Sequence, residues 1–326
     1  MCTSIYEIAL DGTHVLGRTM DWHNLGAGPV FVPRGYHWQS VFDDRAYENR
    51  YAILGSGGAH DNEIDISDGV NEKGLSVQKL TFANGAKFAT TPDDNQISIA
   101  PFELPLYLLG HFSSVAEIEA NIHQIQMMSG ELAAHEYGHP ELHFVAMDPT
   151  GRIVAIETSS EPLRIVDNPL GVLTNAYNFE RQLKQLDHYM AFTDDFKEGR
   201  VPLNTARVTT GNFSGKKVPS GSYTPGSRFI RAAYYKERID RSADENEAIV
   251  SLWHLLNSVS VPKMRGYQQN YSVYRAATCP ETLSYYYEPY NRLGVRKLQM
   301  TDEMITTWRE PHFFDKDDQL TTTTIR

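Results

Sequence analysis

The chain has 326 residues, of which 41% are apolar and 22% are charged, a composition typical of a globular protein with a large core. Acidic residues outnumber basic ones by 41 to 30, and the net charge of −11 argues against nucleic acid as a partner, because phosphate backbones would be repelled. No apolar run reaches the roughly 18 residues that a membrane-spanning helix needs, so no membrane segment is expected.

The N-terminus has neither the basic start nor the apolar stretch of a signal peptide, so we expect a cytoplasmic protein that begins at or next to Met1. Two cysteines, Cys2 and Cys279, are too few for a disulfide framework. We interpret Cys279 as a buried apolar residue.

Short strands dominate the first part of the chain. Residues 2–10 and 14–20 alternate in polarity around the turn Asp11-Gly12, which predicts a β-hairpin. A second tight turn is predicted at 148–151, where the sequence is Asp-Pro-Thr-Gly. Further strands are expected at 30–32, 51–54, 75–82, 142–147, 153–157, 163–166 and 171–174.

Helices are fewer. Pro101 suits the first turn of a helix at 101–109. Capping boxes at 114–117 and 242–245 precede apolar residues at helical spacing, and a short helix is expected at 229–236. Residues 197–227 are rich in Gly, Ser, Thr and Pro and are expected to form a long loop. Since neither a repeat nor a linker interrupts the chain, we expect one domain over residues 1–326.

Cys2 stands where processing could uncover a catalytic thiol. Aminopeptidases remove an initiator Met when the next side chain is small, and the product would carry a thiol and a free α-amine on one residue. An α-amine titrates near neutral pH and can take the thiol proton, so a separate catalytic histidine is not needed. On position alone, a bystander role for Cys2 is the simpler interpretation.

Several motifs follow Cys2 in order along the chain. They are GRTMDW at 17–22, DGVNEKGL at 68–75, GVLTN at 171–175 and YTPGSRFIR at 223–231, with support from 101–104 and 284–290. Together they resemble the choloylglycine hydrolase family, which includes bile-salt hydrolases and penicillin V acylases. The resemblance implies an α+β fold, the αββα four-layer sandwich of N-terminal-nucleophile hydrolases. It also implies hydrolysis of a linear amide in a small-molecule substrate, no cofactor or metal, and a homotetramer.

The resemblance also assigns roles to individual residues. Cys2 would be the nucleophile and, through its α-amine, the base. Arg18 would stabilise the thiolate, Asp21 would accept a hydrogen bond from the α-amine, and Asn175 would donate to the oxyanion. Arg228 would complete the polar cluster around Cys2.

Each of these roles has a plainer alternative. Arg18 and Asp21 could form a surface ion pair, Asn175 could be a turn residue, and Arg228 could sit in solvent at a helix start.

The substrate is less well defined by the sequence. Thr81 stands where bile-salt hydrolases have Asn and penicillin V acylases usually have Tyr, so a backbone N–H of Thr81 would have to serve the oxyanion. The family's glycine-rich loop is also altered at 211–221.

Met20 and Trp22, with the region 127–128, are candidates for an apolar acyl pocket. RTMD at 18–21 resembles penicillin V acylases, whereas 101–122 resembles lactobacillary bile-salt hydrolases. We therefore expect penicillin V or a similar acyl amide, with conjugated bile salts as the alternative and an acyl-homoserine lactone as a further candidate.

A competing motif lies at 135–139, where HEYGH matches the H-E-x-x-H pattern of zinc metallopeptidases. His143 could supply a third ligand. Gly138 and Pro140 oppose the helix that this pattern requires, so a polar loop is expected instead. A non-enzymatic binding protein is the remaining alternative.

Overall fold

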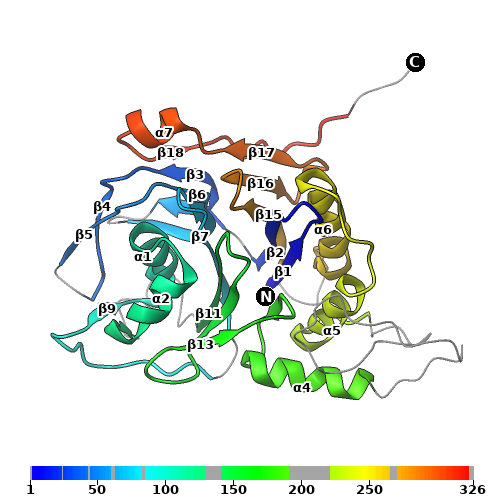
Figure 1. Cartoon of the computed structure of the whole chain (residues 1–326), viewed down its shortest axis with the longest axis horizontal. Helices are drawn as coiled ribbons and strands as arrows, with labels where there is room; N and C mark the ends of the chain where they lie inside the picture. The colour runs from blue at the N-terminus through cyan, green and yellow to red at the C-terminus, as the bar shows by residue number, and fades with distance from the viewer. Residues whose placement is uncertain are drawn as a thin grey trace, which may run out of the picture.

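The computed structural model describes residues 2–23, 25–42, 45–59, 63–82, 85–128, 141–190, 221–264 and 270–322. Over these residues the chain forms two large antiparallel sheets, with helices on the outside of each (Figure 1). This arrangement confirms the expected α+β fold with αββα layers.

The first sheet carries the N-terminus. Its strands lie in the order β14 (Val172–Thr174), β1 (Cys2–Ile8), β2 (His14–Trp22), β15 (Tyr271–Cys279), β16 (Ser284–Pro289) and β17 (Arg296–Gln299). The hairpin of β1 and β2 pairs Cys2 with Met20, and β15 on the other side of β2 pairs Ser272 with Asp21. The beginning of β1 and the end of β2 therefore meet at one end of the sheet.

The second sheet has eight strands in the described part of the chain. Their order is β13 (Arg164–Asp167), β12 (Ile153–Glu157), β11 (Leu142–Met147), β8 (Ser76–Thr81), β7 (Ile64–Asn71), β6 (Ile53–Ala59), β3 (Gly28–Val32) and β18 (His312–Phe313). Gly55 and Gly69 face each other across β6 and β7, and a Cβ on Gly55 would lie 2.1 Å from the carbonyl oxygen of Asp68. Glycine is therefore required where β6 and β7 approach closely, and this approach fixes the strand that carries Asp68.

Helices cover the outer face of each sheet (Figure 1). The first sheet is covered by α4 (Phe179–Met190), α5 (Pro225–Lys236) and α6 (Glu245–Val259), and the second by α1 (Leu104–His111) and α2 (Val115–Asn121). The shorter elements are β4 (His37–Gln39), β5 (Ala46–Glu48), β9 (Ile97–Ile99), η1 (Pro101–Glu103), η2 (Ile122–Gln124), β10 (Ile125–Met127) and α7 (Asp302–Thr307). None of the helices in the described ranges has the length and hydrophobicity of a membrane span.

Two apolar clusters hold the layers together. One lies between the sheets and continues through the first sheet into α5 and α6, with Ile5, Leu80 and Leu252 among its members. The other fills the space between the second sheet and α1, where Val77 and Leu106 are fully buried.

Most sequence-based elements are confirmed, including the hairpin and the strands at 142–147 and 153–157. The capping box predicted at 242–245 lies two residues too early, because the N-cap of α6 is Asp244, which accepts from the Glu247 N–H at 3.0 Å. The box at 114–117 is half right, since Ser114 accepts from Glu117 N–H but the Glu117 carboxylate bonds Ser113.

Two further corrections concern the last third of the chain. Helix α5 begins at Pro225, not at 229, so the expected loop ends earlier than predicted. The rest of that loop, including the altered stretch up to 220, lies outside the described residues. Cys279 is fully buried as expected, and burial raises the pKa of its thiol to about 11.

Candidate active site

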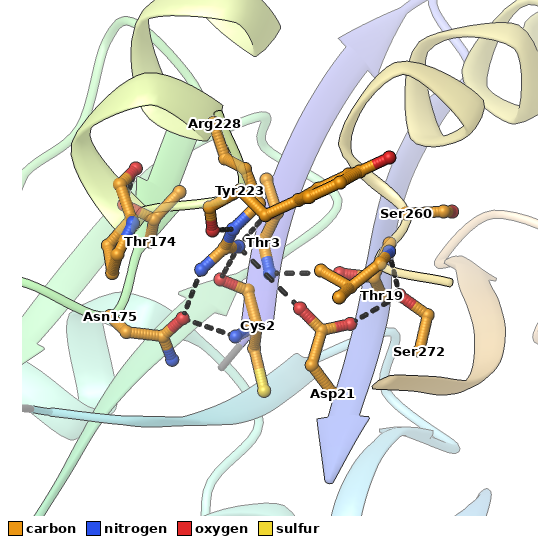
Figure 2. A network of polar contacts seen from close by, with 12 residues as sticks. Cys2, Thr3, Thr19, Asp21, Thr174, Asn175, Tyr223, Arg228, Ser260 and Ser272 are labelled. Atoms are coloured by element: carbon orange, nitrogen blue, oxygen red, sulfur yellow. Dashed lines mark hydrogen bonds and ion pairs between the residues drawn. The ribbon is translucent and has the colours of Figure 1, made fainter. Parts of the chain in front are cut away.

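Cys2 is the first residue of β1 and is almost completely buried. Its sulfur lies 3.0 Å from Nη2 of Arg18 and 3.9 Å from the sulfur of Met20, the residue paired with it on β2. Its backbone nitrogen donates to Oδ1 of Asn175 (Figure 2). Two strands adjacent in sequence thus place a cation against the thiol.

Arg18 is held by a buried acidic group. Its Nη1 donates to the carbonyl of Ser67 at 2.9 Å and lies 3.3 Å from Oδ2 of Asp68. The Asp68 carboxylate also accepts from the hydroxyls of Tyr274 at 2.5 Å and Tyr285 at 2.6 Å. Burial alone would lower the pKa of Arg18, but the nearby charges of Cys2 and Asp68 outweigh it and leave that pKa raised. The thiol therefore faces a permanent cation.

Arg228 lies in the first turn of α5, where Thr224 caps the helix. Its Nη1 donates to the carbonyl of Cys2 at 2.7 Å and lies 3.7 Å from Oδ2 of Asp21, and its Nη2 donates to Oδ1 of Asn175 at 2.7 Å. Burial lowers the pKa of Arg228, while the charges of Asp21 and Cys2 oppose this shift. Figure 2 shows this guanidinium between Asn175 and Asp21, above Cys2.

Asn175 follows β14 and connects Cys2 to Thr81. Because an arginine can only donate, the Asn175 atom next to Arg228 must be its oxygen. The amide nitrogen then points to Thr81 and donates to its carbonyl at 2.8 Å and its hydroxyl at 2.7 Å. The expected oxyanion donor is thus bonded to Thr81 in this structure.

Asp21 is buried at the end of β2, and its Oδ1 accepts from the Ser272 hydroxyl at 2.5 Å. The family resemblance implied that Asp21 accepts from the Cys2 α-amine. With Met1 in the chain, the Cys2 nitrogen is a peptide N–H with a single proton, which it gives to Asn175. The alternative of a surface ion pair between Arg18 and Asp21 is wrong, because both are fully buried and have other partners.

A pocket with about 490 Å³ of empty space, including its open mouth, reaches Cys2. Met20 and Trp22 line it as expected, together with Thr81. Its other lining residues are Leu25, Asp65, Lys79, Phe102 and Leu142. Met127 lines a separate pocket, so the suggestion that the 127–128 region contributes to the acyl pocket is not supported.

The H-E-x-x-H motif at 135–139 lies outside the described residues. His143 is described, and it is buried on β11 with Nδ1 3.8 Å from Oε2 of Glu157 and its ring 4.9 Å from that of Phe82. Within the described ranges, no three His, Cys, Asp or Glu side chains are grouped as metal ligands.

Sequence reasoning missed three supporting residues. Asp68 is the first residue of the motif at 68–75, but its contact with Arg18 depends on how β7 pairs with its neighbouring strands. Ser272 contacts Asp21 only through the pairing of β15 with β2. The side-chain amide of Gln182 on α4 accepts from the Thr174 N–H and donates to the Thr174 carbonyl, both at 3.0 Å, which fixes the segment leading to Asn175.

Comparisons with known proteins agree with this geometry. A family model described as linear amide C–N hydrolases, choloylglycine hydrolase family, matches residues 2–321. The bile salt hydrolase/transferase of Lactiplantibacillus plantarum is 31% identical over 94% of both chains, and that of Clostridium perfringens is 27% identical over 93% of both.

Solved structures show the same fold. A mutant conjugated bile acid hydrolase from Clostridium perfringens superimposes with a TM-score of 0.84 at 24% identity over 100% of both chains. The penicillin V acylase from Agrobacterium tumefaciens gives 0.72 at 20% identity, covering 95% of this chain and 90% of the other. With a family model that spans nearly every residue, this chain belongs to the choloylglycine hydrolase family and is an enzyme that hydrolyses linear amide C–N bonds.

Proposed function

We propose that Cys2, freed by removal of Met1, is the nucleophile of this hydrolase and that its substrates are amides of bulky apolar carboxylic acids. The observation that carries the proposal is the position of Cys2, whose thiol lies 3.0 Å from a buried arginine and which lines a largely apolar pocket. An activated thiol beside an apolar pocket suits attack on an acyl group whose body fills that pocket.

The reaction needs only groups on Cys2 and its neighbours. The α-amine takes the thiol proton, and the thiolate attacks the carbonyl carbon to form a tetrahedral intermediate. The C–N bond breaks as the amine product leaves with the proton held on the Cys2 ammonium. Water, deprotonated by the α-amine, then attacks the thioester, and the carboxylic acid departs as the thiol is restored.

Thr81 and Asn175 are the proposed donors to the oxyanion. Phe82 N–H donates to Glu141 at 2.7 Å across β8 and β11, so the alternation of an antiparallel ladder turns the Thr81 N–H away from β11. On its other side, the pairing of β8 with β7 ends at Gln78. With respect to the described strands, the Thr81 N–H could therefore donate to an oxyanion, and the Asn175 amide would join it by leaving the Thr81 hydroxyl.

Conjugated bile salts are the first substrates to test. The relatives at 27% and 31% identity are named bile salt hydrolases and match this chain over more than nine-tenths of their length, and this outweighs the preference for penicillin V that residues 18–21 and the missing Asn at position 81 suggested. Penicillin V remains the second candidate, because Thr81 supplies no side-chain amide like that of bile-salt hydrolases.

We also propose a single catalytic domain, since both sheets contribute to the site, and a homotetramer, which rests on the family resemblance alone.

The test combines processing with turnover. Intact mass should show loss of Met1, and Cys2→Ala should abolish hydrolysis of glycocholate, taurocholate and penicillin V while circular dichroism stays unchanged. Cys279→Ala is the matched control and should keep activity. Full activity with Met1 retained, or loss of activity on chelation that zinc restores, would contradict the mechanism. A kcat/KM for penicillin V tenfold above that for both bile salts would reverse the substrate order.

A further inference from the structure

An ion pair interrupts the apolar wall of the pocket that reaches Cys2. Lys79 on β8 and Asp65 on β7 both line this pocket, and Nζ of Lys79 bonds Oδ1 of Asp65. Their side chains are only 10% and 7% exposed. The neighbouring wall is apolar, with Trp22 and Phe102 among its residues.

Such a pair is a poor way to stabilise the fold. Taking two charges out of water costs free energy that their attraction often fails to recover, and apolar replacements of similar volume are frequently neutral or stabilising. Within the described ranges, the pair also makes no hydrogen bond to Cys2, Arg18 or Asn175. Its position on the pocket wall therefore indicates a role in binding the substrate.

Both partners keep unused hydrogen-bonding capacity. An ammonium has three protons and a carboxylate has about four acceptor positions. Within the described ranges, the side chains of Lys79 and Asp65 hydrogen-bond only to each other. Donors and an acceptor thus remain side by side at the pocket surface.

The pairing of charges selects the kind of group that can bind. An anion near Lys79 would be repelled by Asp65 at nearly the same distance, so most of its attraction is cancelled. A hydroxyl gains from both charges, because its oxygen accepts from the ammonium while its proton is donated to the carboxylate. A neutral group that donates and accepts at once is therefore the best fit.

The position of the pair indicates which part of the substrate carries this group. Lys79 and Thr81 lie on one face of β8, about 7 Å apart along the strand. Thr81 is bonded to Asn175, which accepts from the nitrogen of Cys2. The pair is therefore set back from the reacting carbonyl by several bonds, within the space that an acyl group would fill.

We propose that the ion pair Lys79–Asp65 is a specificity element that binds a hydroxyl on the acyl group, several bonds from the scissile carbonyl. The proposal rests on the proposed function, in which this pocket holds the acyl group. It selects hydroxylated over unhydroxylated acyl groups of the same shape.

The experiment compares matched acids and their amides. Isothermal titration on the Cys2→Ala variant gives affinities for cholate and unhydroxylated 5β-cholanate, and for 4-hydroxyphenoxyacetate and phenoxyacetate. Turnover of the glycine conjugates or penicillin analogues of the same acids is measured on the active enzyme. In at least one pair, the hydroxylated member should be preferred by about 10- to 100-fold in both readouts.

Replacing both partners together avoids leaving one charge buried and unpaired. Lys79→Met with Asp65→Leu should bring the preference close to one, whereas Lys79→Arg should retain it. The matched control removes the exposed ion pair Arg152–Glu119, which does not line the pocket, and should keep the preference.

Equal affinity for the members of both pairs, binding of none of the four acids, or a preference that survives removal of the ion pair would overturn the proposal. In the last case the pair only joins β7 to β8. If the hydroxylated acid binds more tightly but turnover does not depend on Cys2, this inference stands and the proposed function is wrong.

Discussion

Replacing Arg18 by leucine should strongly reduce the reactivity of Cys2 at neutral pH. The guanidinium lies 3.0 Å from the sulfur, and both groups are buried. At an effective dielectric constant of about 20, a unit charge at this distance stabilises a thiolate by about 5 kcal/mol, which is an upper limit because water enters when the side chain is removed. Half of that value corresponds to roughly a hundredfold loss of thiolate.

Asp68 adds to the effect in the Arg18→Leu variant. Its carboxylate would keep the hydroxyls of Tyr274 and Tyr285, so the local fold should survive, but its charge would no longer be balanced. The double variant Arg18→Leu/Asp68→Asn removes that charge and should recover part of the lost reactivity. The difference in Cys2 reactivity between the two variants separates the effect of losing the Arg18 charge from the effect of leaving the Asp68 charge unbalanced.

The assay is the rate of alkylation of Cys2 by iodoacetamide as a function of pH, followed by mass spectrometry. Cys279 serves as the internal control, because burial raises the pKa of its thiol to about 11 and little of its thiolate is present at neutral pH, so it should react slowly in every variant. We expect a rate at pH 7 that is about 10- to 100-fold lower and a profile moved to higher pH. Unchanged rates in Arg18→Leu would refute the role of Arg18 in activating the thiol.

Three further changes test the rest of the site and the fold. Asn175→Ala should lower kcat by about 100- to 1000-fold if its amide serves the oxyanion, measured with the best substrate of the panel. Thr81→Val removes the hydroxyl that holds this amide but keeps the backbone N–H, so kcat should stay equal or rise a few fold; a tenfold fall would make the hydroxyl an oxyanion donor. Burial raises the pKa of Glu7 from 4.5 to about 7, so stability is lost as pH rises between these values, by about 3 kcal/mol in total. Glu7→Gln should therefore raise Tm at pH 8 and have little effect at pH 4.5, and an equal effect at both would contradict this reasoning.

The part of the site that the sequence could predict is the part built by local pairing. Alternation and the Asp11-Gly12 turn predict a hairpin, and its register sets Cys2 opposite Met20. Arg18 lies two residues before Met20 and therefore on the same face of the strand, so its proximity to the thiol follows from strand geometry, whereas Asp21 lies on the other face and meets Arg228 and Ser272. The motifs of the family resemblance then added Asn175 and Arg228, which no local pattern would have brought to Cys2.

Contacts that depend on distant strands could not be predicted. Ser272 meets Asp21 because β15 pairs with β2, and the register of that pairing shifts at a bulge between Ser272 and Tyr274. A bulge of this kind is set by the packing of both strands and leaves no clear pattern in one of them. The orientation of the Asn175 amide is likewise decided by Arg228, which arrives from a helix 53 residues further on.

The misplaced start of α6 shows how tertiary contacts decide between equal local signals. Ser242 and Asp244 are both good N-caps, and each is followed three residues later by glutamate. The carbonyl oxygens of Ser242 and Ala243 accept from Leu10 and Asp11 in the β1–β2 turn, at 2.8 and 3.2 Å. Because these carbonyls are already used outside the helix, the helix begins only after Asp244.

The charges around Cys2 bear on the proposed proton exchange between its thiol and its α-amine in a buried site. Two cations, Arg18 and Arg228, and two anions, Asp21 and Asp68, surround Cys2 and balance one another. A thiolate and an ammonium on the same residue therefore add no net charge to the cluster. Arg18 faces the sulfur, whereas the nitrogen lies against the Asn175 oxygen. Figure 2 shows the Asp21 carboxylate on the side of Cys2 opposite Asn175. In the proposed mechanism, each charge that the proton transfer creates would thus meet a group of opposite sign or an acceptor, and this reactive pair requires the removal of Met1.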